Sequence, residues 1–380
     1  MPAGERFTSG RRHERRFRPV RIQEPDCERP AAELSLHLVS AEIVDLFSDT
    51  ATQPTRGMRE AMLAAPLGDE QRRSDPTVLA LEERIAGLVG KERAVFMPSA
   101  TMANQVAVAL HCAPGDEVLC HRTAHVINSE GGGLAANAGV QVMALSGERG
   151  IFDAATLLAA LRIDDPHQPT SRAVVVENTS NGGGGSVWPD EAFFGVKRVC
   201  SDRGLALHVD GARLFNAAVA RGVEPSHWGQ HADSVQVCFS KGLGCPFGAV
   251  LAVDAKHERQ VRRIKQRLGG ALRQAGIAAA AMLYALDHHV QRLADDHRRA
   301  ARLGQALSQF EALELGPVET NIVYFRYRPG NASGLAERLR RQGVLVSLGG
   351  PDRLRACTHL GISDDGLERA IRGFAEALRV

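Results

Sequence analysis

An aspartate and a lysine follow two successive strand-like segments of this chain. Asp210 ends the apolar segment Ala206–Asp210, and Lys241 comes just after Val235–Phe239. In an open α/β sheet, ligands bind at the carboxyl ends of the strands. A lysine there can form a Schiff base with an aldehyde, and an aspartate can keep a pyridine nitrogen protonated. Each residue alone is more often a turn or surface residue, but together they predict a site for pyridoxal 5'-phosphate (PLP).

A candidate phosphate site precedes this pair. The stretch Pro98-Ser-Ala-Thr101 lies between a strand-like segment that ends at Met97 and a helical segment that begins near Met102. A helix N-terminus offers free backbone N–H groups and a partial positive charge, which together bind an anion. A serine or threonine there is equally a plain helix cap. The stretch is informative because it comes before the aspartate and the lysine.

Strand-like and helical segments alternate from Ile43 onward, and they must position these residues. Apolar strands that alternate with helices predict an α/β fold, with a mainly parallel central sheet covered by helices on both faces. The expected strands are Ala94–Met97, Glu117–Cys120, Val140–Leu145, Ala173–Glu177, Ala206–Asp210, Val235–Phe239 and Ala249–Val253. The expected helices are Val78–Val89, Thr101–Leu110, Ala154–Leu161 and Glu191–Asp202.

The pattern changes after Ala275–Leu307, which reads as one long helix. Shorter mixed elements follow, so we expect a large PLP-binding domain over residues 41–295 and a smaller α+β C-terminal domain over residues 296–380. Residues 1–40 hold a cluster of arginines mixed with acidic residues. A flexible, solvated N-terminal arm is the favoured interpretation, and a basic docking arm is the alternative.

The composition is that of an ordinary soluble globular protein, which we expect in the cytoplasm. The formal net charge is only +2 and aromatic residues make up 5% of the chain, so we expect no nucleic-acid partner and no membrane partner. The longest apolar run, Ala275–Leu286, is too short to span a bilayer. Seven scattered cysteines without a CxxC pair indicate reduced thiols.

Longer motifs show a family resemblance from about Asp45 to the C-terminus. The sequence resembles the threonine aldolase family, in the β-eliminating lyase group of PLP enzymes with the aspartate-aminotransferase fold, fold type I. The matching motifs are Asp45-Leu-Phe-Ser48-Asp-Thr, Asp75-Pro-Thr, Pro98-Ser-Ala-Thr-Met-Ala-Asn104, Glu177-Asn-Thr, His208-Val-Asp-Gly-Ala-Arg213-Leu-Phe-Asn216, Ser240-Lys-Gly-Leu-Gly, Gly269-Gly-Ala-Leu-Arg-Gln-Ala-Gly276 and Thr358-His359.

The resemblance implies a role for each matching residue. Lys241 would be the Schiff-base lysine, Asp210 would pair with the pyridine nitrogen, and His125 would stack on the cofactor ring. The cofactor phosphate would be bound by Ala100, Thr101 and Arg273, and the substrate carboxylate by Ser48, Arg213 and Arg355. Family enzymes are homodimers or homotetramers with active sites at subunit interfaces, so an oligomer is expected.

The sequence departs from the family around the expected active site. The family usually has histidine where Ser180 stands, glycine at Ala100, arginine at Phe47 and Tyr-Gly-Glu at Arg72-Arg73-Ser74. The missing histidine is expected to contact the β-hydroxyl group that loses its proton, so Ser180, a water or His125 would have to replace it. Arg72 and Arg73 favour a substrate with an anionic or large polar side chain. The alternative is that both arginines are only solvated loop residues.

Two other patterns have simpler interpretations. His121 and His125 are four residues apart, but no HExxH helix or third ligand accompanies them, so no metal site is expected. Gly182–Gly185 lacks the GKS/T ending of a nucleotide-binding loop and is interpreted as a turn.

The expected reaction is cleavage of a β-hydroxy-α-amino acid, threonine-like or with a larger or anionic side chain, to glycine and an aldehyde. Another PLP reaction on the same scaffold is the closest alternative: β-elimination, racemisation or a biosynthetic aldol condensation. A non-catalytic PLP-fold binding protein is the alternative of a different class. The presence of Lys241, Asp210, Arg213 and Arg355 together argues against it.

Overall fold

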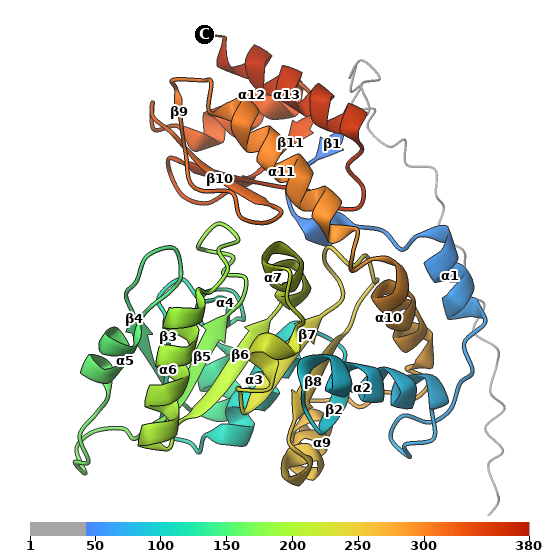
Figure 1. The fold of residues 1–380 in the computed structure, drawn as a ribbon, viewed down its shortest axis with the longest axis vertical. Helices are drawn as coiled ribbons and strands as arrows, with labels where there is room; N and C mark the ends of the chain where they lie inside the picture. The colour runs from blue at the N-terminus through green and yellow to red at the C-terminus, as the bar shows by residue number, and fades with distance from the viewer. Residues whose placement is uncertain (1–42, 380) are drawn as a thin grey trace, which may run out of the picture. The chain divides into compact units, whose positions relative to one another are not determined.

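A seven-stranded sheet carries the strand ends that bear Asp210 and Lys241 (Figure 1). The structure is a computed structural model that describes residues 43–379, so the expected N-terminal arm lies outside the described residues. Only β8 runs antiparallel to its neighbours, which confirms the mainly parallel sheet. The strand order is β2 (Arg93–Met97), β8 (Ala249–Val253), β7 (Ser234–Cys238), β6 (Ala206–Gly211), β5 (Ser171–Glu177), β3 (Glu117–His121) and β4 (Gln141–Leu145).

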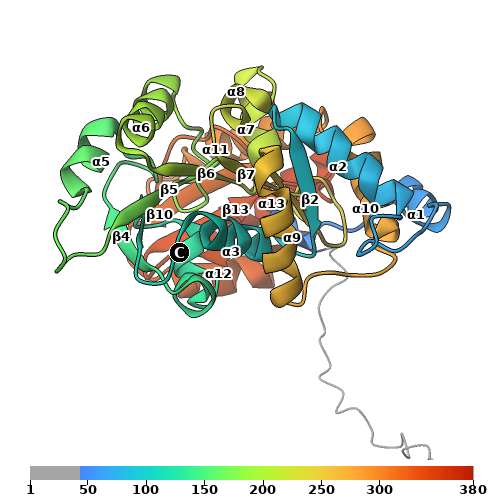
Figure 2. The same cartoon turned by 90° about the horizontal axis from the view of Figure 1, so that it is seen from below.

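Helices cover both faces of this sheet, as the apolar strands predict (Figure 2). One face packs against α2 (Pro76–Val89), α6 (Asp190–Arg203) and α7 (Leu214–Arg221), and the other against α3 (Ala100–His111) and α9 (Glu258–Arg267). Side chains alternate along each strand: in β2, Ala94 and Phe96 enter one core cluster, and Val95 and Met97 enter another. Strands buried on both faces therefore read as continuous apolar runs.

Shorter elements connect the sheet and the covering helices. Asp75 caps α2: its Oδ1 accepts hydrogen bonds from the backbone N–H groups of Thr77 (3.1 Å) and Val78 (3.0 Å), and Pro76 follows it. No helix within residues 43–379 combines the length and apolar character needed to cross a membrane. The connecting elements are the 3-10 helices Asp49–Ala51 and Ala255–His257, the π-helical turn Leu134–Ala138, and α1 (Arg56–Leu63), α4 (His125–Asn128), α5 (Ala154–Ala160) and α8 (Ser226–Gly229).

The long helix expected over Ala275–Leu307 is wrong as a single element. The structure has two helices, α10 (Gly276–His288) and α11 (Leu293–Leu307). At the break, His289 Nδ1 bonds the carbonyl oxygen of Leu243 at 2.7 Å. The break lets α10 pack beside the large sheet while the later part of α11 packs in a separate core cluster with the C-terminal strands.

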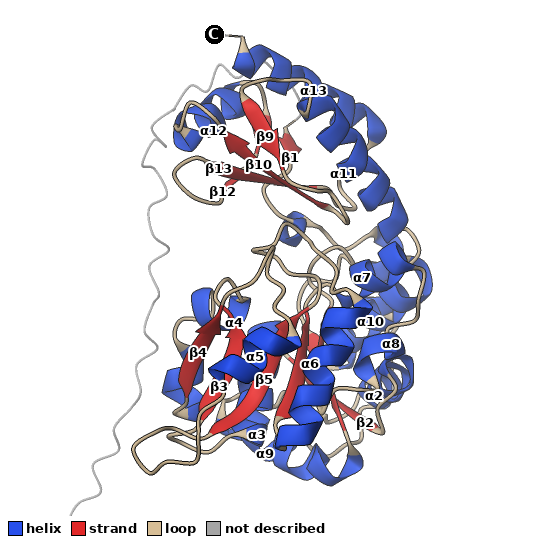
Figure 3. Cartoon of the chain, turned by 60° about the vertical axis from the view of Figure 1, so that its left-hand side comes forward, coloured by secondary structure: helices blue, strands red, loops and turns tan. Residues whose placement is uncertain are grey.

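A second, four-stranded antiparallel sheet lies in the C-terminal part of the chain (Figure 3). Its strand order is β12 (Ser347–Leu348), β13 (Arg353–Cys357), β10 (Ile322–Tyr327) and β9 (Leu313–Leu315), with α12 (Ala332–Arg341) and α13 (Asp364–Leu378) beside it. The strand β1 (Val44–Asp45) pairs with β11 (Val344–Leu345) and shares its core cluster. The first and the last described elements, β1 and α13, thus both belong to this part, and the domain boundary at residues 295–296 stays a prediction.

Candidate active site

The carboxyl ends of the parallel strands bring the predicted residues to one edge of the sheet. Asp210 lies beside Glu177 in the register of β6 and β5, and Lys241 follows β7, the next strand in the sheet. Lys241 Nζ lies 3.5 Å from Cys238 Sγ. Arg213 and Lys241 line the same small cavity. Residues far apart in sequence thus meet because neighbouring strands end together.

Asp210 is buried and oriented by a buried amide. Asn104 Nδ2 donates to Asp210 Oδ2 at 2.9 Å and to Glu130 Oε1 at 2.8 Å. Because Nδ2 of Asn104 donates to two carboxylates, Oδ1 of the same amide points toward His208. Nε2 of His208 donates to this oxygen at 3.1 Å. Burial lowers the pKa of His208 to about 4, so this ring is neutral and the proton on Nε2 is fixed by the network.

His125 is held by two buried glutamates from different elements. Its Nδ1 donates to Glu130 Oε1 at 2.9 Å, and its backbone N–H donates to Glu177 Oε2 at 2.7 Å. The hydrogen bond to Glu130 is the main cause that raises the pKa of His125. Burial, followed by the charge of Asp210, raises the pKa of Glu177 to about 7. Since Nδ1 is occupied, the Nε2 atom of His125 remains for substrate or cofactor.

The predicted phosphate site is a helix N-terminus, as expected. Ser99 caps α3, and its Oγ accepts from the backbone N–H of Met102 at 3.2 Å. Ala100 and Thr101 occupy the first turn, where backbone N–H groups have no intrahelical acceptor. Arg273 lies elsewhere in this chain: its side chain is 61% exposed and pairs with Asp69 at 3.3 Å. The structure therefore brings Ala100 and Thr101 to the sheet edge, but pairs Arg273 with another loop.

Two of the three predicted carboxylate-binding residues, Arg213 and Arg355, meet at one amide oxygen. Asn181 Oδ1 accepts from Arg355 Nη1 at 2.7 Å and from Arg213 Nη1 at 3.3 Å. An anionic oxygen at that point would receive the same donors. The other edge of Arg213 is taken by Asp49, which accepts from Nε and Nη2 at 2.7 Å each. Ser48 Oγ accepts from Thr50 Oγ1 at 2.9 Å, which leaves its own proton free to be donated.

The Asp49–Arg213 pair is fully buried. Burial alone would raise the pKa of Asp49, but the charge and hydrogen bonds of Arg213, together with the charge of Lys241 and the hydrogen bond from Asn321, outweigh it and hold that pKa well below its usual range. The reciprocal effect raises the pKa of Arg213 above its usual value, although burial alone would lower it. Asn321 Nδ2 also donates to Asp49 at 3.1 Å. Asp49 thus fixes the guanidinium that faces the site.

Ser180 lies in a tight glycine-rich turn. It is 1% exposed, and its Oγ accepts from the backbone N–H of Gly183 at 3.2 Å. A Cβ on Gly150 would lie 1.9 Å from that Oγ, and a Cβ on Gly183 would lie 1.8 Å from the carbonyl oxygen of Arg149. Residues Asn181–Gly184 form a turn, which confirms the interpretation of this stretch. The Ser180 hydroxyl is therefore used inside the turn.

The side chains of His121, Arg72 and Arg73 each contact residues outside the candidate active site. His121 Nδ1 bonds Thr123 Oγ1 at 2.8 Å and its Nε2 donates to the carbonyl oxygen of Gly147 at 3.2 Å, so it does not join His125. Arg72 lies 3.7 Å from Asp69, and Arg73 lies 3.2 Å from Glu258. Substrate selection by the arginine pair stays a prediction.

Several supporting residues received no role from the sequence. Asp49, Asn104 and Glu177 lie within motifs that were recognised, so their position in those motifs was an available signal. Glu130 and Asn181 had no such signal. Glu130 follows His125 by five residues, which is no regular helix or strand spacing, and the contact of Asn181 with Arg355 joins positions 174 residues apart.

The residues at this edge fit PLP. A lysine amine, a buried carboxylate with both oxygens hydrogen-bonded, a histidine ring and a helix N-terminus suit the aldehyde, the pyridine nitrogen, the ring face and the phosphate of that cofactor. His125, Glu130 and Asp210 also place one ligand atom each within 4.8 Å of one another. Hydrogen bonds already explain this cluster, since Asn104 bridges the two carboxylates.

Comparison with known proteins agrees with this geometry. The chain is 39% identical over 326 residues to the low specificity L-threonine aldolase of Escherichia coli K12, covering 86% of this chain and 96% of that protein. It is 36% identical over 346 residues to low-specificity L-threonine aldolase 1 of Arabidopsis thaliana, covering 88% and 96%. The solved structure of Leishmania major threonine aldolase superposes with a TM-score of 0.76 at 18% identity, covering 88% and 99%. Residues 45–329 match the beta-eliminating lyase family, and this chain is therefore a PLP-dependent lyase that belongs to that family.

Proposed function

We propose that this chain cleaves a threonine-like β-hydroxy-α-amino acid to glycine and an aldehyde. The observation that carries the proposal is the juxtaposition of Lys241 and Asp210 at neighbouring strand ends, with Arg355 joined to Arg213 through Asn181. Curated relatives with this activity in their names, 36–39% identical over most of the chain, support it.

Different residues of the chain bind the cofactor and the substrate. Lys241, Asp210 and the first turn of α3 would hold PLP, which supplies the electron sink for bond cleavage at Cα when it is bound. Arg355 binds the substrate carboxylate and, with Asn181, fixes the direction of the Cα–Cβ bond. The buried Asp49 keeps Arg213 in place beside them.

His125 is the proton acceptor that the site supports best. Ser180 is buried with its hydroxyl oxygen bonded inside the turn, so its side chain is poorly placed for substrate. The side chain of His125 is 35% exposed, and its Nε2 is not needed for the bond to Glu130. We therefore assign to Nε2 of His125 the proton that leaves the β-hydroxyl group, in place of the family histidine that Ser180 replaces.

Glycine release tests this function. The PLP-loaded protein is given threonine, allo-threonine, phenylserine and 3-hydroxyaspartate, and glycine, keto acid and ammonia are measured. Glycine that depends on Lys241, shown by its loss in Lys241→Ala, is the expected result. Keto acid and ammonia without glycine would refute the aldolase proposal and indicate β-elimination.

The assembly state and the compartment are part of the same proposal. A homodimer or homotetramer in the cytoplasm follows from the family resemblance and the composition. Analytical ultracentrifugation of the PLP-loaded protein tests the assembly: a monomer at micromolar concentration would contradict it.

A further inference from the structure

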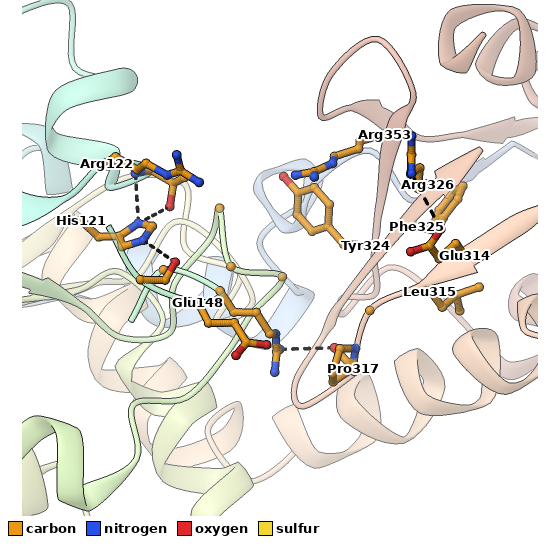
Figure 4. A pocket seen from close by; sticks show the side chains of 18 residues that line it. His121, Arg122, Glu148, Glu314, Leu315, Pro317, Tyr324, Phe325, Arg326 and Arg353 are labelled. Carbon is orange, nitrogen blue, oxygen red and sulfur yellow. Dashed lines mark hydrogen bonds and ion pairs between the residues drawn. The ribbon is translucent and has the colours of Figure 1, made fainter. Parts of the chain in front are cut away.

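A pocket of about 520 Å³ lies next to the proposed substrate site, and its walls come from both sheets (Figure 4). From the large-sheet side come the segments His121–Thr123, Gly147–Gly150 and Gly182–Gly184, and from the small-sheet side come Tyr324–Arg326 and Arg353. This volume is in the range of sites that bind small molecules, which is ~300–1,000 Å³. The turn Gly182–Gly184 directly follows Asn181, so the pocket adjoins the carboxylate-binding group.

The strand register connects this pocket to Arg355. Tyr324 pairs with Arg355, and Arg326 pairs with Arg353, so these four side chains share one face of the small sheet. Arg353 and Arg355 are two residues apart on β13, which separates them by about 7 Å along the strand. The guanidinium group of Arg353 is thus a second positive group on the same face of the strand as Arg355, the arginine proposed to bind the substrate carboxylate.

Two of the pocket's four arginines have no acidic partner among residues 43–379. Arg149 pairs with Glu319 and Arg326 with Asp352. Arg122 and Arg353 make no ion pair within that part of the chain, and Figure 4 shows their side chains extending into the pocket from opposite walls. Glu148 and Glu314 also line the pocket, but neither forms an ion pair with Arg122 or Arg353 among residues 43–379, so these two guanidinium groups remain open to an anionic ligand.

We propose that this pocket binds an anionic group at the far end of the substrate's β-substituent, between Arg122 and Arg353. The preferred substrate is then a β-hydroxy-α-amino acid whose side chain ends in a carboxylate or phosphate. Its α-carboxylate lies at Arg355 and its second anion at Arg353, with the Tyr324 ring beside the connecting carbons. This inference rests on the proposed aldol cleavage and names its substrate class.

A matched substrate pair tests the inference on the full-length, PLP-loaded protein. We would measure kcat/KM for glycine release from 3-hydroxyglutamate and from 3-hydroxyglutamine, which have the same shape and differ in the terminal charge. The wild-type protein should prefer the anionic substrate by at least ~10-fold, because hydrogen bonds to charged groups are stronger than neutral ones. High salt should reduce that preference, since both arginines are exposed.

Variants assign the preference to the pocket. Arg353→Gln and Arg122→Gln should each lower kcat/KM for 3-hydroxyglutamate about 10-fold and affect 3-hydroxyglutamine much less. Arg328→Gln, an exposed arginine outside the pocket, is the matched control and should leave both values unchanged. A further arm adds inorganic phosphate to threonine cleavage, to detect a free anion that binds the pocket instead of the substrate.

The outcomes separate this inference from the proposed function. Glycine from threonine without a preference for 3-hydroxyglutamate, or a preference that survives both glutamine variants, would overturn the pocket assignment alone. A phosphate effect on threonine cleavage that disappears in Arg353→Gln would assign the pocket to a free anion and would also overturn it. No glycine from any substrate would overturn the aldolase proposal and this inference together.

Discussion

Replacing Glu130 with glutamine should lower the pKa of His125. The substitution keeps the shape of a side chain that is fully buried, and it removes one charge. The glutamine oxygen can take the place of Oε1, which accepts from both Asn104 and His125 in the wild type. His125 would then keep its proton on Nδ1, but a neutral amide stabilises the protonated ring less than a carboxylate does.

The size of the effect follows from one charge-assisted hydrogen bond. The bond from His125 Nδ1 to Glu130 Oε1 is 2.9 Å long, and the histidine side chain is 35% exposed. Hydrogen bonds to charged groups contribute about 1.5–3 kcal/mol, and the exposure places this one at the lower end. The pKa of His125 should therefore fall, because the variant loses the charge that stabilises the protonated ring.

The consequence for stability has a definite sign. Because Glu130 raises the pKa of His125, the bond stabilises the folded wild type fully below the ordinary histidine pKa of 6.5. That contribution is lost as the pH rises through the raised pKa. The wild type should therefore lose stability relative to Glu130→Gln between pH 6.5 and the folded-state pKa of His125.

An NMR titration measures the shift directly. The Cε1–H signal of His125, assigned with a His125→Asn variant, is followed against pH in wild type, Glu130→Gln and the exposed control Glu311→Gln. PLP affinity, from the quenching of tryptophan fluorescence, gives a second readout. An unchanged titration in Glu130→Gln, or an equal shift in Glu311→Gln, would refute the view that Glu130 sets the protonation of His125.

Three further predictions follow from buried charges and crowded glycines. Asp49→Asn should cost about 3–5 kcal/mol in the free energy of unfolding, measured with urea, because it leaves a buried arginine unpaired; a loss below 1 kcal/mol would contradict this. Gly183→Ala should raise KM for threonine more than ~10-fold, since its Cβ would meet backbone at 1.8 Å, whereas Gly87→Ala has nothing within 4 Å and should not. The raised pKa of Glu177, about 7, favours its neutral form, so wild-type stability should fall relative to Glu177→Gln from pH 4.5 to 7. Thermal unfolding of both proteins across that range checks this, and parallel curves would count against it.

The sequence by itself determined the main elements and the chemical pair. Seven apolar, β-branched segments predicted the seven strands of the large sheet to within about two residues at each end, because strands buried on both faces must be apolar throughout. The positions of Asp210 and Lys241 after their strands, together with the candidate phosphate site upstream, predicted PLP, since parallel strands end at one edge.

Only the tertiary structure decided how that pair is supported. The pairing of Asp49 with Arg213 joins positions 164 residues apart, so no local pattern predicts it. His125 and Glu130 are only five residues apart, but neither helix nor strand spacing brings such positions together. The break between α10 and α11 is likewise set by packing against different core clusters, which helix propensity does not register. The pocket between Arg122 and Arg353 exists because two sheets face each other, and neither arginine was distinctive in the sequence.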